Sequence, residues 1–352
     1  VYDADTKRYI GDIEEDFLER LRPGDIFVLG GRTYEFRYAR GMRCYVRKAE
    51  GLYPTIPAWF SELLPLSFDL ALKIGEFRRK ILRALKRKDK RKVREIIRKL
   101  PMDENSRVAL LNYILEQYKY CGEIPNDKEV LIEETNDLHG RRFLVFHFLF
   151  GRKVNDTLSR VFGIILGKQM RSNIGLVVSD NGFALILPKK KKFSLEKAFE
   201  EVLSSNIEEL LKKNIRRLEL MKRRFRHVAS RSYLVLRNYK GYKISVSKQQ
   251  INAQTLLRVC EEIDKDFPLI KETYREILED VMDLENALKV INWFKEKKLK
   301  WKFIRTDVPS PFAHNLIVLG EADVIFMKER KERLLELYEE VQKRLKKVGK
   351  SL

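Results

Sequence analysis

Short runs in which apolar and polar residues alternate fill much of the first 60 residues. Three of these runs are Asp25–Leu29, Thr33–Tyr38 and Met42–Lys48, and Gly-Gly and Arg-Gly pairs separate them. The alternation predicts strands, and the glycine-containing pairs predict turns. Three consecutive strands of this size favour a small N-terminal β-barrel or part of one. Pro54 and Pro57 then mark a connector that cannot form a helix.

Helical spacing of apolar residues begins after this connector. Ser67 can cap a helix that runs to about Lys88, because apolar residues recur there every three to four positions. Shorter helices are expected at Arg91–Lys99 and Glu104–Lys119, the second ending before Gly122. The pattern therefore predicts a helical segment.

The pattern changes again after residue 125. Strands are expected at Glu129–Glu134 and Arg141–Phe150, a helix at Lys153–Met170, and a hairpin across Asp180-Asn181-Gly182. This β-β-α-β-β order requires antiparallel pairing, so it predicts an α+β fold rather than a doubly wound one.

The rest of the chain is predicted to be mainly helical from residue 194 to 297, with a break near Asn238–Gly241. Late strands are expected at Lys300–Asp307 and Leu316–Leu319. The sequence thus predicts four parts: a small β-barrel and connector (1–60), a helical segment (61–124), a mixed α+β domain (125–328) and a C-terminal charged helix (329–352).

The charge of the chain favours a polyanionic partner. Its 352 residues include 72 Lys and Arg against 51 Asp and Glu, a formal net charge of +21. Glu76–Lys99 holds 13 basic residues against 3 acidic ones, and Lys212–Lys240 holds 11 against 1. By contrast, Glu261–Glu285 carries 10 acidic residues against 3 basic ones. This polarisation favours nucleic acid over a membrane surface or a set of solvated helix faces.

The composition excludes several classes of protein. Hydrophobic residues make up 44% of the chain, which rules out full disorder. The longest apolar runs, such as Phe143–Phe150, are too short to cross a bilayer. Three widely spaced cysteines favour a reducing, cytoplasmic setting. The excess of Glu and Lys over Gln is typical of a thermophile, and a start at Val1 without Met suggests an excised fragment.

No complete catalytic or metal site is evident in the sequence. Gly163–Gln169 resembles a phosphate-binding loop only superficially, because its spacing is one residue short and no Ser or Thr follows Lys168. None of the four histidines pairs with another His or Cys at ligand spacing. His147, between two phenylalanines in a predicted strand, is better explained as a partly buried structural residue.

The second basic segment combines side chains that suit nucleic acid. Arginine and lysine bind phosphate, and asparagine can read base edges. The candidate binding residues are Arg224, Arg226, His227, Arg231, Arg237, Asn238 and Lys240. Among them, Arg224, Arg226, Arg231 and Lys240 are expected to form one strand-facing patch. A network of buried polar groups between helices is the alternative.

Trp59 is a further candidate, because it lies in the proline-rich connector beside the predicted barrel. An exposed tryptophan there would offer a surface on which a base can stack. The alternative is a tryptophan that fills the open end of the barrel.

Several of these stretches together resemble the C-terminal part of the helicase core of Lhr-type (large helicase-related) superfamily 2 helicases. They are Phe17–Arg32, Pro57–Trp59, Phe146–Arg160, Arg224–His227 with Leu236–Gly241, and Pro309–Ala313. In this resemblance, the region from about 125 to 320 corresponds to the DEAD/H-associated domain of the family.

The resemblance implies an accessory region of an ATP-dependent helicase that moves 3′ to 5′ on single-stranded nucleic acid, with a role in DNA repair. It leaves open whether RNA or a hybrid also binds. It places two RecA-like motor domains and a winged helix before this region in the same polypeptide. ATP and Mg²⁺ would belong to those motor domains, so this chain is not expected to hydrolyse ATP alone. Trp59 is implied to pack on a base of the tracking strand.

Two other functions compete with this interpretation. A stand-alone nucleic-acid-processing enzyme would use polar residues such as Asn155 and Asp156. A protein-interaction module would use the acidic segment Glu261–Glu285.

The role of Trp59 can be tested in the intact helicase. If the indole stacks on a base, W59A should leave DNA-stimulated ATP hydrolysis largely intact while unwinding falls sharply. A barrel-filling tryptophan would instead cost about 3–5 kcal/mol of stability, so both activities and the melting temperature would fall together. Parallel assays of ATPase, unwinding and melting temperature separate the two outcomes.

Overall fold

The computed structural model describes residues 1–13, 15–18, 21, 23–29, 32–40, 43–49, 64–138, 140–216, 218–319 and 330–347. The chain divides into two compact units, each of which draws on separate stretches of sequence. The first comprises mainly residues 1–64 and 222–273, and the second most of the remainder. Trp59 lies outside the described residues, so its predicted role remains a prediction.

The N-terminal part of the first unit is a four-stranded sheet with a short helix, α1 (Glu15–Leu18). Its strands are β1 (Tyr2–Asp3), β2 (Ile26–Leu29), β3 (Arg32–Arg40) and β4 (Arg43–Lys48). They lie in the order β1-β4-β3-β2, with β1 parallel to β4 and the other pairs antiparallel. Alternate side chains, including Phe27, Phe36 and Val46, point into one buried cluster, as the period of two predicts.

The prediction of a closed β-barrel is not confirmed. Closure requires hydrogen bonds between the two outermost strands, and the described residues contain no pairing between β1 and β2. These strands have only two and four residues, so the described sheet is open.

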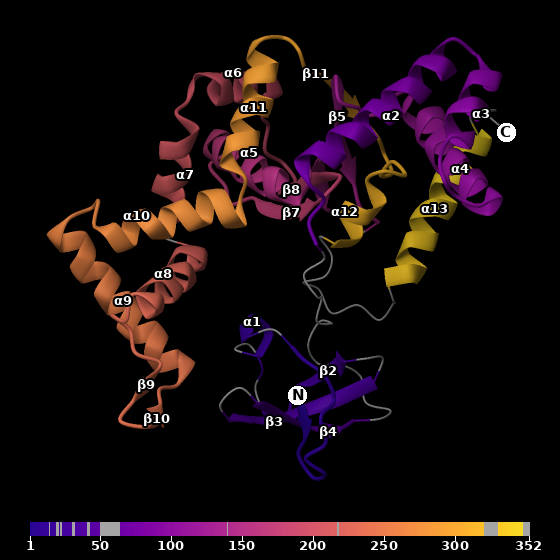
Figure 1. Ribbon diagram of the computed structural model, residues 1–352. Helices are drawn as coiled ribbons and strands as arrows, with labels where there is room; N and C mark the ends of the chain where they lie inside the picture. The colour runs from indigo at the N-terminus through magenta and orange to yellow at the C-terminus, as the bar shows by residue number, and fades with distance from the viewer. Residues whose placement is uncertain are drawn as a thin grey trace. The chain divides into compact units, whose positions relative to one another are not determined.

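The second part of the first unit is helical, with a hairpin inserted in it. Its elements are α8 (Glu219–Arg231), β9 (Asn238–Tyr239), β10 (Tyr242–Lys243), α9 (Val246–Ile263) and α10 (Pro268–Arg275). Figure 1 shows α8 and α9 side by side, with β9 and β10 at the end of this pair. The predicted break near residue 238 is therefore a β-hairpin.

The second unit is built on a five-stranded sheet. Its strands are β5 (Glu129–Asn136), β6 (Arg142–His147), β7 (Gly175–Ser179), β8 (Gly182–Leu187) and β11 (Lys300–Arg305). The order is β11-β5-β6-β8-β7, with β11 parallel to β5 and all other pairs antiparallel. This mixed sheet confirms the α+β class, the β-β-α-β-β unit and the late strand near residue 300.

Helices cover both faces of this sheet (Figure 1). On one face lies α5 (Arg152–Met170), where Phe162 packs beside Phe146, whose ring stacks on Phe183 at 4.4 Å between centroids. On the other face lies α12 (His314–Leu319), where Ile317 packs with Phe143. The segment Leu316–Leu319 is therefore helical, and the strand predicted there is wrong. A short apolar run that is buried all round has no period that separates strand from helix.

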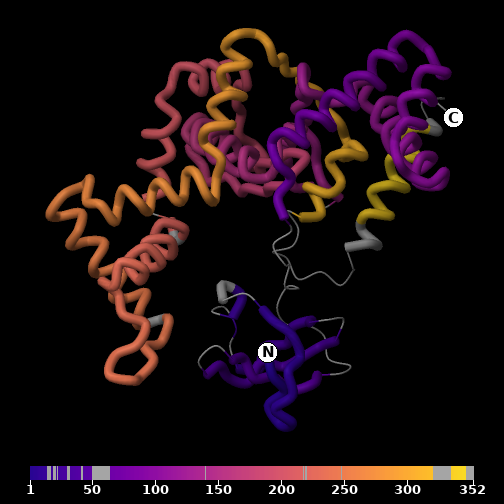
Figure 2. Tube along the Cα trace, in the orientation of Figure 1, coloured from indigo at the N-terminus to yellow at the C-terminus, as the bar shows by residue number. Residues whose placement is uncertain are grey.

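Further helices pack around this centre. Three of them lie on the α5 side: α6 (Leu195–Ser204), α7 (Ile207–Ile215) and α11 (Leu284–Lys295). A π-helical turn, η1 (Glu276–Val281), follows α10 in the sequence. The helical segment contains α2 (Phe68–Lys86), α3 (Lys90–Arg98) and α4 (Glu104–Cys121). The Ser67 side chain accepts a hydrogen bond from Leu70 N, which confirms the predicted cap. The C-terminal helix α13 (Arg330–Lys347) runs beside α4 (Figure 2).

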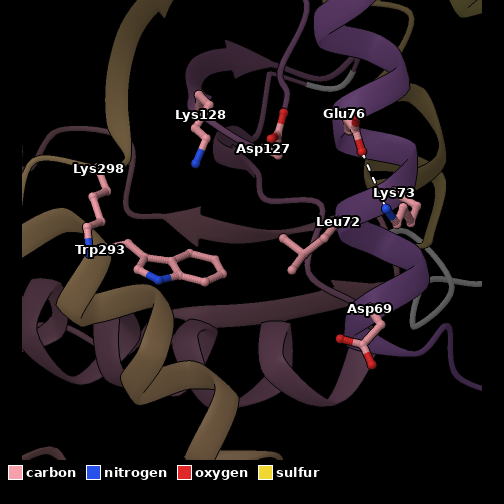
Figure 3. Close-up of a pocket in the computed structure, with 8 residues that line it drawn as sticks. All are labelled: Asp69, Leu72, Lys73, Glu76, Asp127, Lys128, Trp293 and Lys298. Carbon is pink, nitrogen blue, oxygen red and sulfur yellow. Dashed lines mark ion pairs between the residues drawn. The ribbon is translucent and has the colours of Figure 1, made fainter.

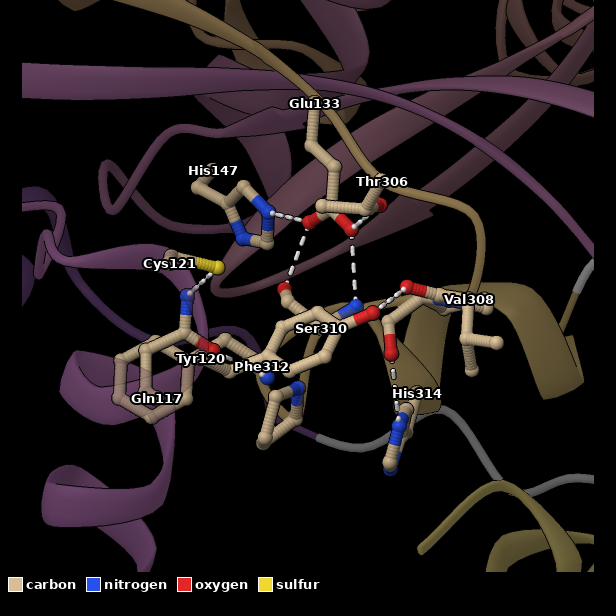
Figure 4. Close-up of polar contacts among 12 residues, drawn as sticks. Gln117, Tyr120, Cys121, Glu133, His147, Thr306, Val308, Ser310, Phe312 and His314 are labelled. Atoms are coloured by element: carbon tan, nitrogen blue, oxygen red, sulfur yellow. Dashed lines mark hydrogen bonds and ion pairs between the residues drawn. The ribbon is translucent and has the colours of Figure 1, made fainter. Parts of the chain in front are cut away.

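A buried carboxylate joins the sheet to the segment that leads into α12 (Figure 4). Glu133 on β5 is fully buried. Its two oxygens accept hydrogen bonds from Ser310 N (2.8 Å), Ser310 Oγ (2.6 Å) and Thr306 Oγ1 (2.6 Å), and one oxygen lies 2.8 Å from His147 Nε2 on β6. Burial alone raises the pKa of Glu133, but the contact with His147 and the two hydroxyls outweigh it, so its pKa lies below 4.5.

The same segment is tied to α4. Phe312 N donates to Gln117 Oε1 at 3.0 Å, and Tyr120 Oη donates to the Val308 carbonyl at 2.9 Å. Gln117 is fully buried, and Phe312 packs in the apolar cluster of the helical segment. The segment from 306 to 313 therefore connects three parts of the second unit.

We expect Glu133 to stabilise this unit in a pH-dependent manner. Since folding lowers its pKa, the contribution is complete above about pH 4.5 and is lost as the pH falls through the folded value. E133Q should lower the free energy of unfolding by about 3 kcal/mol at pH 7. The difference from the unaltered chain should shrink as the pH falls through the folded pKa of Glu133, because the protonated carboxyl is then as neutral as the glutamine amide.

Guanidinium unfolding followed by tryptophan fluorescence measures this difference, since Trp293 and Trp301 lie in the same unit as Glu133. E339Q, at an exposed position of α13, serves as the control and should change little at any pH in the series. An E133Q difference that stays constant from pH 7 down to the pH at which the unaltered chain unfolds would contradict the assignment.

Candidate nucleic-acid interface

The basic segment around α8 has one buried face and one exposed face. Met221, Phe225, Val228 and Ala229 are buried, at the helical spacing that forms an apolar stripe. Arg224 is half-buried and Arg231 is exposed. These two arginines are seven residues apart, so they share one side of the helix.

Arg226 does not belong to this exposed side. It lies two residues from Arg224, which turns it to nearly the opposite side of the helix, and it is only 3% exposed. Its guanidinium lies 3.5 Å from Nε2 of the half-buried His227. The single patch expected from Arg224, Arg226, Arg231 and Lys240 is therefore not formed as predicted, because Arg226 is part of the interior.

The other predicted residues lie at the hairpin and are accessible. Arg237, Asn238 and Lys240 are all exposed. The neighbouring Gln249 and Gln250 are committed to backbone contacts instead: Gln249 Nε2 donates to Ile244 O at 2.8 Å and Gln250 Nε2 to Lys222 O at 3.3 Å. The structure thus brings together the predicted residues C-terminal to α8 as one exposed basic group.

A second basic surface lies in the other unit, in a groove between α2 and α3 of about 700 Å³. Its charged lining consists of six cations, Lys73, Lys80, Arg83, Arg87, Lys92 and Lys99, and three carboxylates, Glu76, Asp89 and Glu95. Glu76 pairs with Lys80 at 2.9 Å, and this hydrogen bond lowers the pKa of its carboxyl. Cations outnumber carboxylates, so the groove has a net positive charge that suits phosphate.

A smaller pocket of about 430 Å³ adjoins this groove and has a different character (Figure 3). Its lining contains three carboxylates and three lysines, so their formal charges cancel. Trp293 from α11 and Leu72 from α2 are its apolar residues. Trp293 stacks on Phe68 with 5.8 Å between ring centroids. Sequence analysis did not single out Trp293, because its position on α11 gives no sign that it faces a pocket.

The residues considered for catalysis have structural roles. Asn155 is fully buried, and its Nδ2 donates to Phe148 O and Ser179 O, each at 2.9 Å. Asp156 pairs with Arg160 one helical turn along α5, at 3.1 Å. His147 is 2% exposed and bound to Glu133, which confirms the structural interpretation of this histidine.

The described part of the chain also lacks two other kinds of feature. Its residues contain no group of three or more His, Cys, Asp or Glu side chains that could hold a metal ion. Nor does any described helix combine the length and apolar character that a membrane span requires.

Comparison with known proteins identifies the family of the chain. Residues 124–313 match the DEAD/H-associated family, and residues 1–55 match the winged helix domain of the large helicase-related protein. The chain belongs to the large helicase-related (Lhr) family. The winged helix was expected before this region, but residues 1–55 of the chain itself match it.

Two similar proteins are named ATP-dependent helicases. The chain is 48% identical over 97% of its length to ATP-dependent helicase Lhr-Core protein 2 of Thermococcus barophilus. It is 43% identical over 99% of its length to ATP-dependent helicase Lhr-Core of Methanocaldococcus jannaschii. It spans 39% and 40% of these two relatives, respectively.

A solved structure shares the fold. The Mycobacterium smegmatis helicase Lhr bound to ssDNA and AMP-PNP matches with a TM-score of 0.61 and 22% identity, over 76% of this chain and 33% of that one. At this identity the likeness concerns the fold alone.

The buried position of Arg226 leads to a prediction that separates it from its neighbours. R226E would place a carboxylate in a site built around a guanidinium, so the melting temperature should fall by more than about 5 °C. R237E, at an exposed position, should change it by no more than about 1 °C. Calorimetry on both variants measures this contrast. An unchanged melting temperature for R226E would contradict the interior position of Arg226 and would favour its place in the predicted patch.

Proposed function

We propose that this chain is the single-strand-binding accessory region of an ATP-dependent 3′–5′ DNA helicase that acts in DNA repair. The motor domains that bind ATP and Mg²⁺ would lie elsewhere in the same polypeptide. In this proposal the chain grips the strand that the motor moves and does not hydrolyse ATP by itself.

The observation that carries the proposal is the pair of exposed basic surfaces, one in each unit. Between Glu219 and Glu261 the sequence contains no Asp or Glu at all, so the hairpin region has no acidic side chain of its own to offset its cations. The α2–α3 groove adds a second site of positive charge. Such surfaces bind phosphate by releasing counterions, which gives a grip that does not depend on base sequence.

The family relationship supports the same function. Relatives that align with nearly all of this chain are named ATP-dependent helicases, and the solved neighbour is bound to ssDNA. Against a stand-alone enzyme, Asn155 and Asp156 are engaged in contacts within and around α5.

The proposal predicts a steep dependence of binding on salt. If about five phosphates are contacted, the slope of log affinity against log salt should be near −3.5 for a labelled oligo(dT) strand. Fluorescence anisotropy at several salt concentrations gives this slope. A flat plot would contradict the electrostatic grip.

Matched variants locate the cations that bind the strand. R83Q/R87Q in the α2–α3 groove should make the slope shallower by about 0.7 for each phosphate that the groove no longer neutralises. K265Q/K271Q removes the same charge from exposed positions in the acidic segment and should leave the slope unchanged. If both pairs change it equally, only net charge matters and the groove has no special role.

A further inference from the structure

The β9–β10 hairpin has a defined geometry. Tyr239 pairs directly with Tyr242, and Asn238 with Lys243. The two turn residues, Lys240 and Gly241, have φ angles of 49° and 80°, which is the positive-φ pair that a tight two-residue hairpin turn requires.

The base of the hairpin is fixed to its surroundings. Ile244 N donates to Arg237 O at 2.8 Å, which extends the ladder by one pair. Gln249 Nε2 donates to Ile244 O at 2.8 Å, and Ser245 caps the start of α9. Val235, just before the hairpin, is 3% exposed. The tip is therefore presented in a set orientation with respect to α9.

Both tyrosines of the hairpin face solvent on the same side. Directly paired residues of two antiparallel strands project from the same face, so the two rings form one aromatic surface and Asn238 and Lys243 project from the other face. Tyr239 is 56% exposed and Tyr242 is 80% exposed. Such large apolar rings are usually covered by other side chains, and these two are not. Exposed groups of apolar side chains commonly mark binding surfaces.

Cations surround this aromatic surface. The Lys240 ammonium lies 5.5 Å from the centroid of the Tyr239 ring, and Arg237, two residues before Tyr239 and so on the same face, is exposed. Since no acidic residue occurs from 220 to 260, this surface would repel a basic partner. Aromatic rings flanked by cations suit a partner that carries both planar bases and phosphates.

We propose that Tyr239 and Tyr242 stack on unpaired bases of a single strand while Lys240 and Arg237 hold the adjoining phosphates. This inference rests on the proposed function, because it assigns a base-stacking site within a region proposed to bind single strands. It adds an interaction that net charge alone does not supply, one that distinguishes an unstacked strand from a duplex, whose bases are stacked on each other.

The test compares Y239A/Y242A with Y239F/Y242F in binding to labelled oligo(dT). Phenylalanine keeps the ring, so the second variant should bind within about twofold of the unaltered chain. Loss of both rings should weaken binding about tenfold or more. The salt slope should stay the same for Y239A/Y242A, because every phosphate-binding cation is kept, and should become shallower for R237Q/K240Q.

An abasic strand of equal length supplies the decisive control. It keeps the phosphates but lacks bases, so the unaltered chain and Y239A/Y242A should bind it equally. Y9A removes a 54% exposed tyrosine outside the hairpin and should leave oligo(dT) affinity unchanged. The melting temperatures of the hairpin variants should agree with that of the unaltered chain, as expected for exposed side chains.

The outcomes distinguish the two proposals. Undiminished oligo(dT) affinity in Y239A/Y242A would contradict the stacking site. The exposed rings would then be explained better as a surface that binds another protein. An equal loss of affinity for the abasic strand would also overturn the stacking site. If the unaltered chain binds no single strand at low salt, the proposed function itself fails.

Discussion

The second unit depends on one buried carboxylate. Glu133 accepts four hydrogen bonds and gathers strands β5 and β6 and the segment before α12 around two oxygen atoms. A buried charge is tolerated only when its partners are complete, so these parts must be in register for the unit to be stable. Gln117 and Tyr120 extend the same constraint to α4. The surfaces proposed to bind nucleic acid contain no member of this network, which separates the residues that stabilise the fold from those offered to a partner.

Most of the fold of the second unit could be predicted from sequence because its signals are local. Ser67 caps α2, the Asp-Asn-Gly turn joins β7 to β8, and α5 has a clear apolar stripe. The helix α12 could not be predicted, since its apolar run is buried between the sheet and other helices and has no polar face to set a period. The pairing of β11 with β5 joins residues about 170 positions apart, and no local pattern records such a contact.

The exposure of the candidate binding residues was harder to predict than the fold. Composition identified the basic segment, but it could not tell which arginines face solvent. Arg226 is interior and Arg237 is exposed, although both lie in the same run of positive charge. The exposure of Tyr239 and Tyr242 was not predicted, because a tyrosine can lie in a core or on a surface. They are exposed because they lie in a β-hairpin. The sequence analysis predicted only a break between helices at this position.

The packing of Phe312 against the helical segment has a consequence for where this protein can be divided. The family match begins at residue 124, yet Phe312, near its end, is buried among side chains of α2, α3 and α4, which lie before that boundary. A cut at residue 124 would remove the side chains of α2, α3 and α4 that bury Phe312. We therefore expect a fragment that begins at the family boundary to expose this ring, so the second unit should not be divided there.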